Sequence, residues 1–136
     1  MEYFGLPDTV KTIYGGAFAS TFEIKTIGSD TFVFPRDLET IKGGAFSATN
    51  IEHITFNDKI STIENGAISN NGSYTPTHTI TFPNTDHIQE VAAYAFSGCL
   101  NVQTITMNAS EGSIANAPWG AKNNGGSGNP TVVWTG

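Results

Sequence analysis

The sequence predicts a mainly β repeat solenoid: a short right-handed stack of turns with a parallel sheet on its concave side and irregular or single-turn helical corners. Two observations favour this fold. A phrase of small and apolar residues recurs, as TIYGGAF at residues 12–18 and TIKGGAF at residues 40–46. Length variation falls at fixed points of the repeat, and stacked repeats tolerate this because loops on one face can grow without disturbing the stack.

The recurring corner combines a small residue with a large one. Four and seven positions before the small residue stand branched apolar residues, such as Ile13 and Val10 in the first unit. Glycine pairs at 15–16 and 43–44 permit a tight turn, and the alanine lets neighbouring backbones approach each other. A single unit cannot bury this face alone, so units must stack. The corners are Ala17-Phe18, Ala45-Phe46, Ala67-Ile68 and Ala95-Phe96.

Short alternating runs before the corners predict strands with one buried face. They are rich in β-branched and aromatic residues, which suit a pleated surface, and prolines at positions 7, 35 and 83 end three of them. A second set of short strands is expected near VKTI, LETI, KISTI and IQEV, where the chain returns to the core. The strand positions that we take as equivalent are Leu6, Phe34, Phe56, Phe82, Met107 and Trp134.

The length and the repeat indicate one domain over residues 1–136. Four full units are expected at about 1–108, followed by a degenerate capping unit at 109–136 in which Trp119 replaces the corner phenylalanine. A parallel β-helix has a similar period and is the main alternative, but the repeated corner and the irregular lengths disfavour it.

One segment, FEIKTIGSDTFVFP at residues 22–35, fits the repeat in two ways. Register with LNVQTITM favours Ile27 as the strand residue, whereas the alternating run favours Phe32. We expect a small hairpin or bulge at residues 28–30, which would reconcile the two.

The composition excludes several classes of partner. Only 13% of the residues are charged, the formal net charge is -6, and the lysines and arginines are scattered. Nucleic acid and anionic membrane surfaces are therefore not expected to bind. No stretch approaches the ~20 apolar residues of a membrane-spanning helix, so membrane insertion is not expected. Cys99 is the only cysteine, which excludes an internal disulfide, and its place at a corner favours a buried, inert thiol.

No catalytic, cofactor-binding or metal-binding residues are expected. The three histidines, His53, His78 and His87, lack the HxH and HExxH spacings of metal sites. No serine lies in a G-x-S-x-G elbow, and NNGGSGN at residues 123–129 lacks the lysine of a phosphate-binding loop. The sequence therefore favours a binding or structural role over an enzyme.

The frame apolar-x-x-Ile-x-Phe-Pro followed by Val-x-x-Ile-x-x-x-Ala-Phe resembles the BspA-type leucine-rich repeat, also called the Treponema pallidum type, over essentially the whole chain. The cysteine that this family often carries three residues after the phenylalanine is present once, as Cys99 after Phe96. Leucine is rare here and Ile68 replaces one phenylalanine, which departs from the family pattern. The ending APWGA…TVVWTG is similar to the end of such arrays and implies a C-terminal cap.

The resemblance implies a short leucine-rich-repeat stack that acts as a non-catalytic, adhesin-like protein-binding module of a bacterial cell-surface or secreted protein. Its ligand would be a protein or a glycan, with host extracellular-matrix proteins among the candidates. The alternative is a structural spacer in a larger surface protein whose activity lies in another domain. The start MEYFGLPDTV lacks the organisation of a signal peptide, so signal and anchor are expected outside this chain.

The outward residues of the concave strands form the candidate binding face, because such sheets are commonly binding surfaces in solenoids. Threonine is also favoured in exposed strands, so its recurrence at the outward positions has a structural explanation as well. Tyr74, in the insertion SNNGSYTPTH, is a candidate loop contact, although such an aromatic more often folds over its own core. Alternation places on the face Tyr3, Gly5, Thr31, Val33, His53, Thr55, Thr79, Thr81, Thr104, Thr106, Val133 and Thr135.

The first residues have the pattern of a strand and carry no polar cap. An uncapped end of a solenoid exposes apolar surface. We therefore expect further repeats of the parent protein, or self-association, at the N-terminal end.

Overall fold

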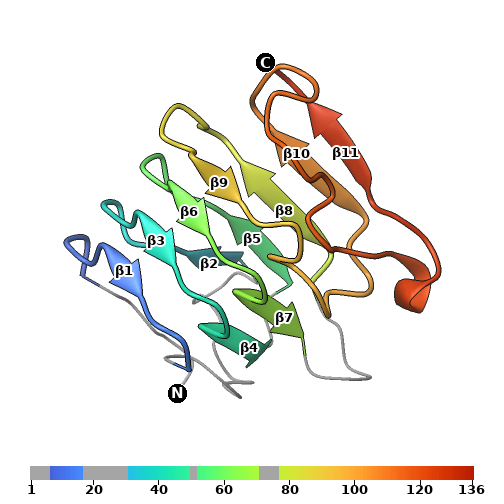
Figure 1. Cartoon of the computed structure of the whole chain (residues 1–136), viewed down its shortest axis with the longest axis horizontal. Coiled ribbons are helices and arrows are strands. Elements are labelled where there is room, and N and C mark those ends of the chain that lie inside the picture. Colours follow the sequence, from blue (N-terminus) through green and yellow to red (C-terminus); the bar gives the residue numbers. More distant parts are fainter. Residues whose placement is uncertain (1–6, 17–30, 50–51, 71–76) are drawn as a thin grey trace.

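Short β-strands make up almost all the regular structure. The computed structural model describes residues 7–16, 31–49, 52–70 and 77–136, which form a stack of parallel strands (Figure 1). A 3-10 turn, η1, covers Asn124–Gly126. The strands are β1 (Thr12–Ile13), β2 (Thr31–Val33), β3 (Thr40–Ile41), β4 (Phe46–Thr49), β5 (His53–Thr55), β6 (Thr62–Ile63), β7 (Ile68–Asn70), β8 (Thr79–Phe82), β9 (Glu90–Val91), β10 (Thr104–Met107) and β11 (Thr131–Trp134).

Strands of successive turns pair in parallel. The five-stranded sheet has the order β11-β10-β8-β5-β2, and the four-stranded sheet has the order β1-β3-β6-β9. A third, two-stranded sheet joins β4 and β7. In Figure 1 the chain passes between the two larger sheets in successive turns as the stack rises from the N-terminal to the C-terminal end. This arrangement confirms the predicted repeat solenoid and the second set of short strands.

The register of the five-stranded sheet confirms three of the strand positions taken as equivalent, Phe82, Met107 and Trp134. Met107 lies opposite both Phe82 and Trp134, so the last three turns align as the sequence predicted. In β2, Phe32 pairs with Ile54, which makes the alternating run FVFP the strand. The competing Ile27 and the expected bulge at residues 28–30 lie outside the described residues, as do residues 1–6, the corner Ala17-Phe18 and Tyr74.

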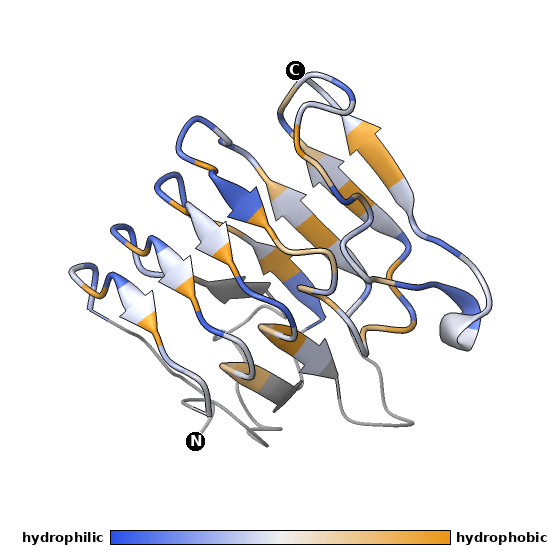
Figure 2. Ribbon diagram, viewed as in Figure 1, coloured by the Kyte–Doolittle hydropathy of each residue, from blue (hydrophilic) through white to orange (hydrophobic). Residues whose placement is uncertain are grey.

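A column of aromatic rings runs through the core. The Phe56 ring lies between those of Phe34 and Phe82, at centroid distances of 5.0 and 4.4 Å and nearly parallel to both. The column continues from Phe82 to Trp119 at 6.3 Å and from Trp119 to Trp134 at 6.2 Å. Figure 2 shows hydrophobic bands at matching places on successive strands, because the same positions are apolar in each turn. Neighbouring turns therefore bury each other's apolar surface.

The corners fill another part of this core. Phe46 and Ile68 are fully buried and begin β4 and β7, so two of the corners continue into strands where at most a helical turn was expected. Cys99 is also fully buried, with its thiol 3.6 Å from the carbonyl oxygen of Ile68, as an inert core residue should be. The remaining buried corner residues are Ala45, Ala67, Ala95 and Phe96.

Trp119 fills the space of a corner phenylalanine from a different backbone position. The N–H of Phe96 donates to the carbonyl of Trp119, just as the N–H of Ile68 donates to that of Ala95. Trp119 thus stands in the backbone register of the alanine, while its ring reaches the buried column. Its indole Nε1–H donates to the Ala115 carbonyl at 2.7 Å, which satisfies the polar group that the ring brings inward.

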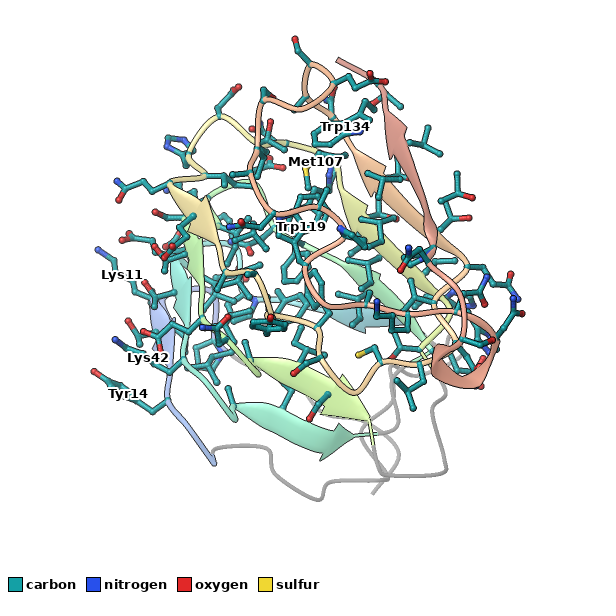
Figure 3. All side chains as sticks on the ribbon, turned by 45° about the vertical axis from the view of Figure 1, so that its right-hand side comes forward. Lys11, Tyr14, Lys42, Met107, Trp119 and Trp134 are labelled. Carbon is teal, nitrogen blue, oxygen red and sulfur yellow. The ribbon has the colours of Figure 1, made fainter. Side chains whose placement is uncertain are left out.

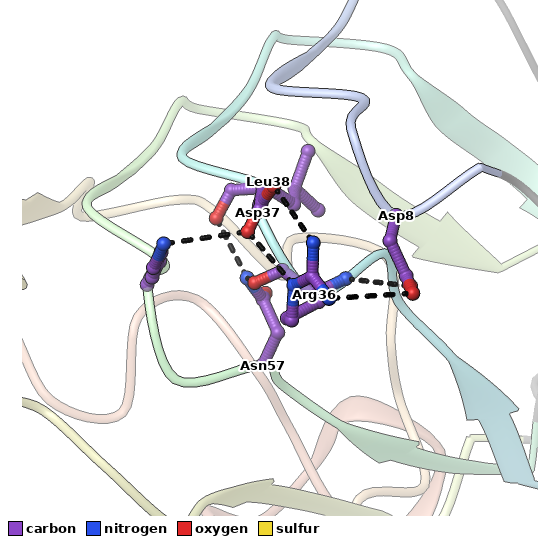
Figure 4. A network of polar contacts seen from close by, with 6 residues as sticks. Asp8, Arg36, Asp37, Leu38 and Asn57 are labelled. Carbon is purple, nitrogen blue, oxygen red and sulfur yellow. Dashed lines mark hydrogen bonds and ion pairs between the residues drawn. The ribbon is translucent and has the colours of Figure 1, made fainter.

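Polar side chains join successive turns beside the strand ends (Figure 4). The Nδ2 amide of Asn57 donates to the carbonyls of Arg36 and Leu38, at 3.1 and 2.7 Å. Asp37 accepts from Arg36 Nε at 3.1 Å and from Lys59 Nζ at 3.3 Å. The hydrogen bond from Arg36 lowers the pKa of Asp37. Both cations are exposed, so these ion pairs contribute little to stability.

Within the described residues, no helical segment has the length and hydropathy needed to cross a bilayer.

Replacing Phe56 tests the ring column. We expect Phe56→Ala to lower the free energy of unfolding by about 3–5 kcal/mol, because it removes a buried ring packed on two sides. The matched variant Phe56→Leu keeps most of the volume and should cost about 1–2 kcal/mol. Urea unfolding followed by tryptophan fluorescence measures both. A loss below about 1 kcal/mol for Phe56→Ala would contradict the packing described here.

Gly43 and Gly44 test the close approach of the turns. A Cβ at Gly43 would lie 2.7 Å from the Asn65 carbonyl oxygen, whereas one at Gly44 would meet nothing within 4 Å but would sit at a φ of +78°. Gly43→Ala should therefore cost about 2–3 kcal/mol, because the backbones must separate. Gly44→Ala should cost about 1 kcal/mol, and Gly44→Asn less, since asparagine adopts this conformation more readily. Equal losses of unfolding free energy for Gly43→Ala and Gly44→Asn would rule out the close approach.

Candidate functional site

The solvent-facing positions of the five-stranded sheet lie in two aligned rows. In parallel sheets, neighbouring strands are about 4.8 Å apart, so each row is a regular series of side chains. In the backbone register, Thr31 and Val33 of β2 lie opposite His53 and Thr55 of β5. The first row is His53, Thr79, Thr104 and Thr131, and the second is Thr55, Thr81, Thr106 and Val133.

These rows alternate with the buried positions of the same strands. In β8 and β10 the threonines are half-buried, while the apolar residues between them are fully buried. Thr55 and Val133 are exposed, at the two ends of their row within the described side chains. His53 and Thr79 lie side by side, with 2.7 Å between Nδ1 and Oγ1, so part of the row is held by its own hydrogen bond.

The chemistry of the face is that of hydroxyl and methyl groups. None of β5, β8, β10 and β11 contains an acidic residue, a lysine or an arginine. Such a surface can form hydrogen bonds with a partner without the cost of desolvating charges. Across the described residues, no cluster of three histidine, cysteine or acidic side chains is arranged to hold a metal ion.

The comparison with family models agrees with this geometry. The model of the BspA type leucine rich repeat region matches residues 1–119, in six copies. This chain belongs to the BspA-type leucine-rich repeat family. Repeats of this family are generally non-catalytic and are typically protein-binding modules of bacterial surface proteins. No curated protein and no solved structure matches the chain.

The BspA-type stack brings together most of the residues proposed from the sequence and adds one. His53, Thr55, Thr79, Thr81, Thr104 and Thr106 lie in the two rows, and Val133 extends the second. Thr131 was missed, although it lies opposite Thr104 in the first row. The sequence contained a signal for Thr131. Once Met107 is aligned with Trp134, the residues three positions before them are Thr104 and Thr131, so these two threonines occupy equivalent positions.

A second polar feature lies at the corner of the four-stranded sheet. Lys42 and Glu64 occupy the same position in successive turns, directly after the paired Ile41 and Ile63. Lys42 Nζ lies 3.2 Å from Glu64 Oε2, and the N–H of Gly43 donates to Glu64 Oε1 at 3.1 Å. The Gly43 hydrogen bond and the Lys42 ammonium together lower the pKa of Glu64.

The two parts of the stack differ in what they expose. Figure 3 shows Lys11, Tyr14 and Lys42 projecting from one side, with Met107, Trp119 and Trp134 gathered toward the C-terminal end. Lys42 and Glu64 pair at a corner directly after β3 and β6, while strands β5, β8, β10 and β11 carry no acidic residue, lysine or arginine.

The pH dependence of stability tests the Glu64 contact. Because the pKa of Glu64 is lower in the folded chain than in the unfolded chain, its contribution is complete above the unfolded value of about 4.3 and is lost as the pH falls through the folded value. The free energy of unfolding of the wild type should exceed that of Glu64→Gln above about pH 5 and converge with it toward about pH 2. A difference that does not change with pH would contradict the contact.

Proposed function

We propose that residues 1–136 act as one adhesin-like, protein-binding module of a bacterial cell-surface or secreted protein. The contact face is the outer side of the five-stranded sheet, formed by Thr31, Val33, His53, Thr55, Thr79, Thr81, Thr104 and Thr106. The ligand is a protein or a glycan, with host extracellular-matrix proteins as the first candidates.

The observation that carries the proposal is the in-register, charge-free pair of rows on this sheet. The centres of protein interfaces are depleted of charged residues, whereas ordinary exposed surfaces are not. The chain has 12 acidic and 6 basic residues, and none of them lies in β5, β8, β10 or β11.

The size of the face limits the strength of the contact. Five strands at about 4.8 Å spacing and strands of about four residues define a surface of roughly 19 by 13 Å. Stable interfaces use about 800 Å² on each partner, about three times this area. The ligand must therefore also touch flanking loops, for which the segment carrying Tyr74 is our candidate, or bind weakly and rely on several copies.

Paired substitutions on the two sheets test the face. Thr55→Lys/Thr81→Lys places two ammonium groups on neighbouring strands of the five-stranded sheet, where they should weaken binding at least about tenfold. Thr40→Lys/Thr62→Lys makes the same change on neighbouring strands of the four-stranded sheet and should leave binding unchanged. Biolayer interferometry against extracellular-matrix proteins and mucins measures both, and circular dichroism confirms that both variants fold.

The outcomes separate the candidate functions. Saturable binding that only the Thr55→Lys/Thr81→Lys variant loses supports the adhesin-like module and its face. Binding that both variants lose equally would refute the face. No binding by folded wild-type protein across the panel would favour the structural spacer.

A further inference from the structure

Strand β11 ends the five-stranded sheet and leaves one edge of it open. In a parallel ladder, alternate residues bond to the strands on either side. The N–H groups of Thr131 and Thr135 donate to carbonyls of the β10 side, at Gln103 and Met107. The main-chain groups of Val132 and Trp134 therefore face away from β10, and in the described residues β11 has β10 as its one partner strand.

The chain itself turns away from this edge. After Thr135, the N–H of Gly136 donates to the carbonyl of Ala109, beyond the end of β10. Gly136 packs so tightly there that a Cβ would lie 2.6 Å from the Cα of Ala109. Gly136 thus lies against the residues that follow β10 and not along the open edge.

Within β11 itself, Thr131–Trp134, the features that keep edge strands apart are lacking, although Pro130 directly precedes the strand. Natural edge strands often carry lysine, proline or an inward charge that prevents pairing with another chain. Residues 123–136 contain no charged residue, and Val133 is an exposed aliphatic side chain in the middle of β11, with 39% of its surface accessible. An uncharged edge does not repel its own copy, whereas any charged side chain near a two-fold axis would meet itself.

We propose that β11 pairs with β11 of a second copy of this chain, antiparallel and around a two-fold axis at Val133. In this register Val132 and Trp134 of one copy exchange main-chain hydrogen bonds with Trp134 and Val132 of the other. Val133 is then the non-hydrogen-bonded pair on the axis, in which the side chains lie closest, and each covers the other's exposed surface.

The two neighbouring registers are less favourable, because each of them lacks a free backbone N–H donor. An axis at Val132 would set Trp134 opposite Pro130, which has no N–H to donate. An axis at Trp134 would require the N–H of Gly136, which already donates to Ala109. With the axis at Val133, the outward-facing N–H and C=O groups of Val132 and Trp134 all find hydrogen-bond partners in the other copy.

The dimer would join two five-stranded sheets edge to edge, with the threonine rows of both on the same side because the axis is perpendicular to the sheet. The candidate contact face would double in area and so come closer to the roughly 800 Å² on each partner that stable interfaces use. The inference itself does not depend on a ligand, so it stands or falls separately from the proposed function.

Sedimentation equilibrium of the whole chain over a concentration series tests the proposal. We expect a reversible monomer–dimer equilibrium whose dissociation constant rises at least about tenfold in Val133→Lys, since two ammonium groups would meet on the axis. Thr55→Lys, in the same row three strands away, is the matched control and should dimerise as the wild type does.

Cross-linking gives a second reading that does not require a destabilising charge. In a non-hydrogen-bonded antiparallel pair the Cα atoms lie about 4.5 Å apart, within the range of a disulfide. Val133→Cys should therefore form a symmetric disulfide under mild oxidation, while Thr106→Cys in the neighbouring strand should not. A monomer at every concentration without cross-linking, a dimer insensitive to Val133→Lys, or assemblies larger than a dimer would each overturn the proposal.

Discussion

The contact of each turn with the next is the interaction on which the rest of this molecule depends. No turn can enclose a core by itself, because it offers only strands of two to four residues and one corner. Phe56 illustrates the constraint: its ring is covered by Phe34 from one turn and by Phe82 from another. The parallel ladders fix the register, since a slip of one residue would bring the buried side chains of a strand to the solvent. The glycine at position 43 follows from the same constraint, as the backbones approach too closely for a side chain.

The surface features are consequences of this stacking. Because every turn repeats the same alternation, the outward residues of β5, β8 and β10 align into rows whether or not a ligand exists. What the stacking does not require is the lack of any acidic residue, lysine or arginine in β5, β8, β10 and β11, since residues beside other strands, such as Lys42 and Glu64, are charged. In the described residues β11 is an outer strand of the five-stranded sheet, and it carries no charged residue. Binding and self-association are therefore both proposed at places where the repeat itself gives no explanation.

The sequence was sufficient for the fold because the buried positions are periodic. The alignment of Phe82, Met107 and Trp134 was predicted from spacing alone and is confirmed by the strand register, as is the equivalence of the corner residues Phe46 and Ile68. The third sheet was not predicted, because Phe46 and Ile68 carry the same apolar signal in a strand as in a helical turn. The backbone position of Trp119 was also missed, since a large side chain can reach one space from two positions. The candidate face remains a prediction, because threonine is favoured in exposed strands with or without a partner.

The central claim is that stability resides in contacts between adjacent turns, and a double-mutant cycle measures this directly. Phe56→Leu and Phe82→Leu change rings that stack at 4.4 Å, and we expect their effects on the free energy of unfolding to couple by about 0.5–1.5 kcal/mol. Phe56→Leu and Trp134→Leu change rings three strands apart, at roughly 14 Å, and should be additive within about 0.5 kcal/mol. Equal coupling in the two cycles, or none in the first, would contradict a stack held together by its neighbouring turns.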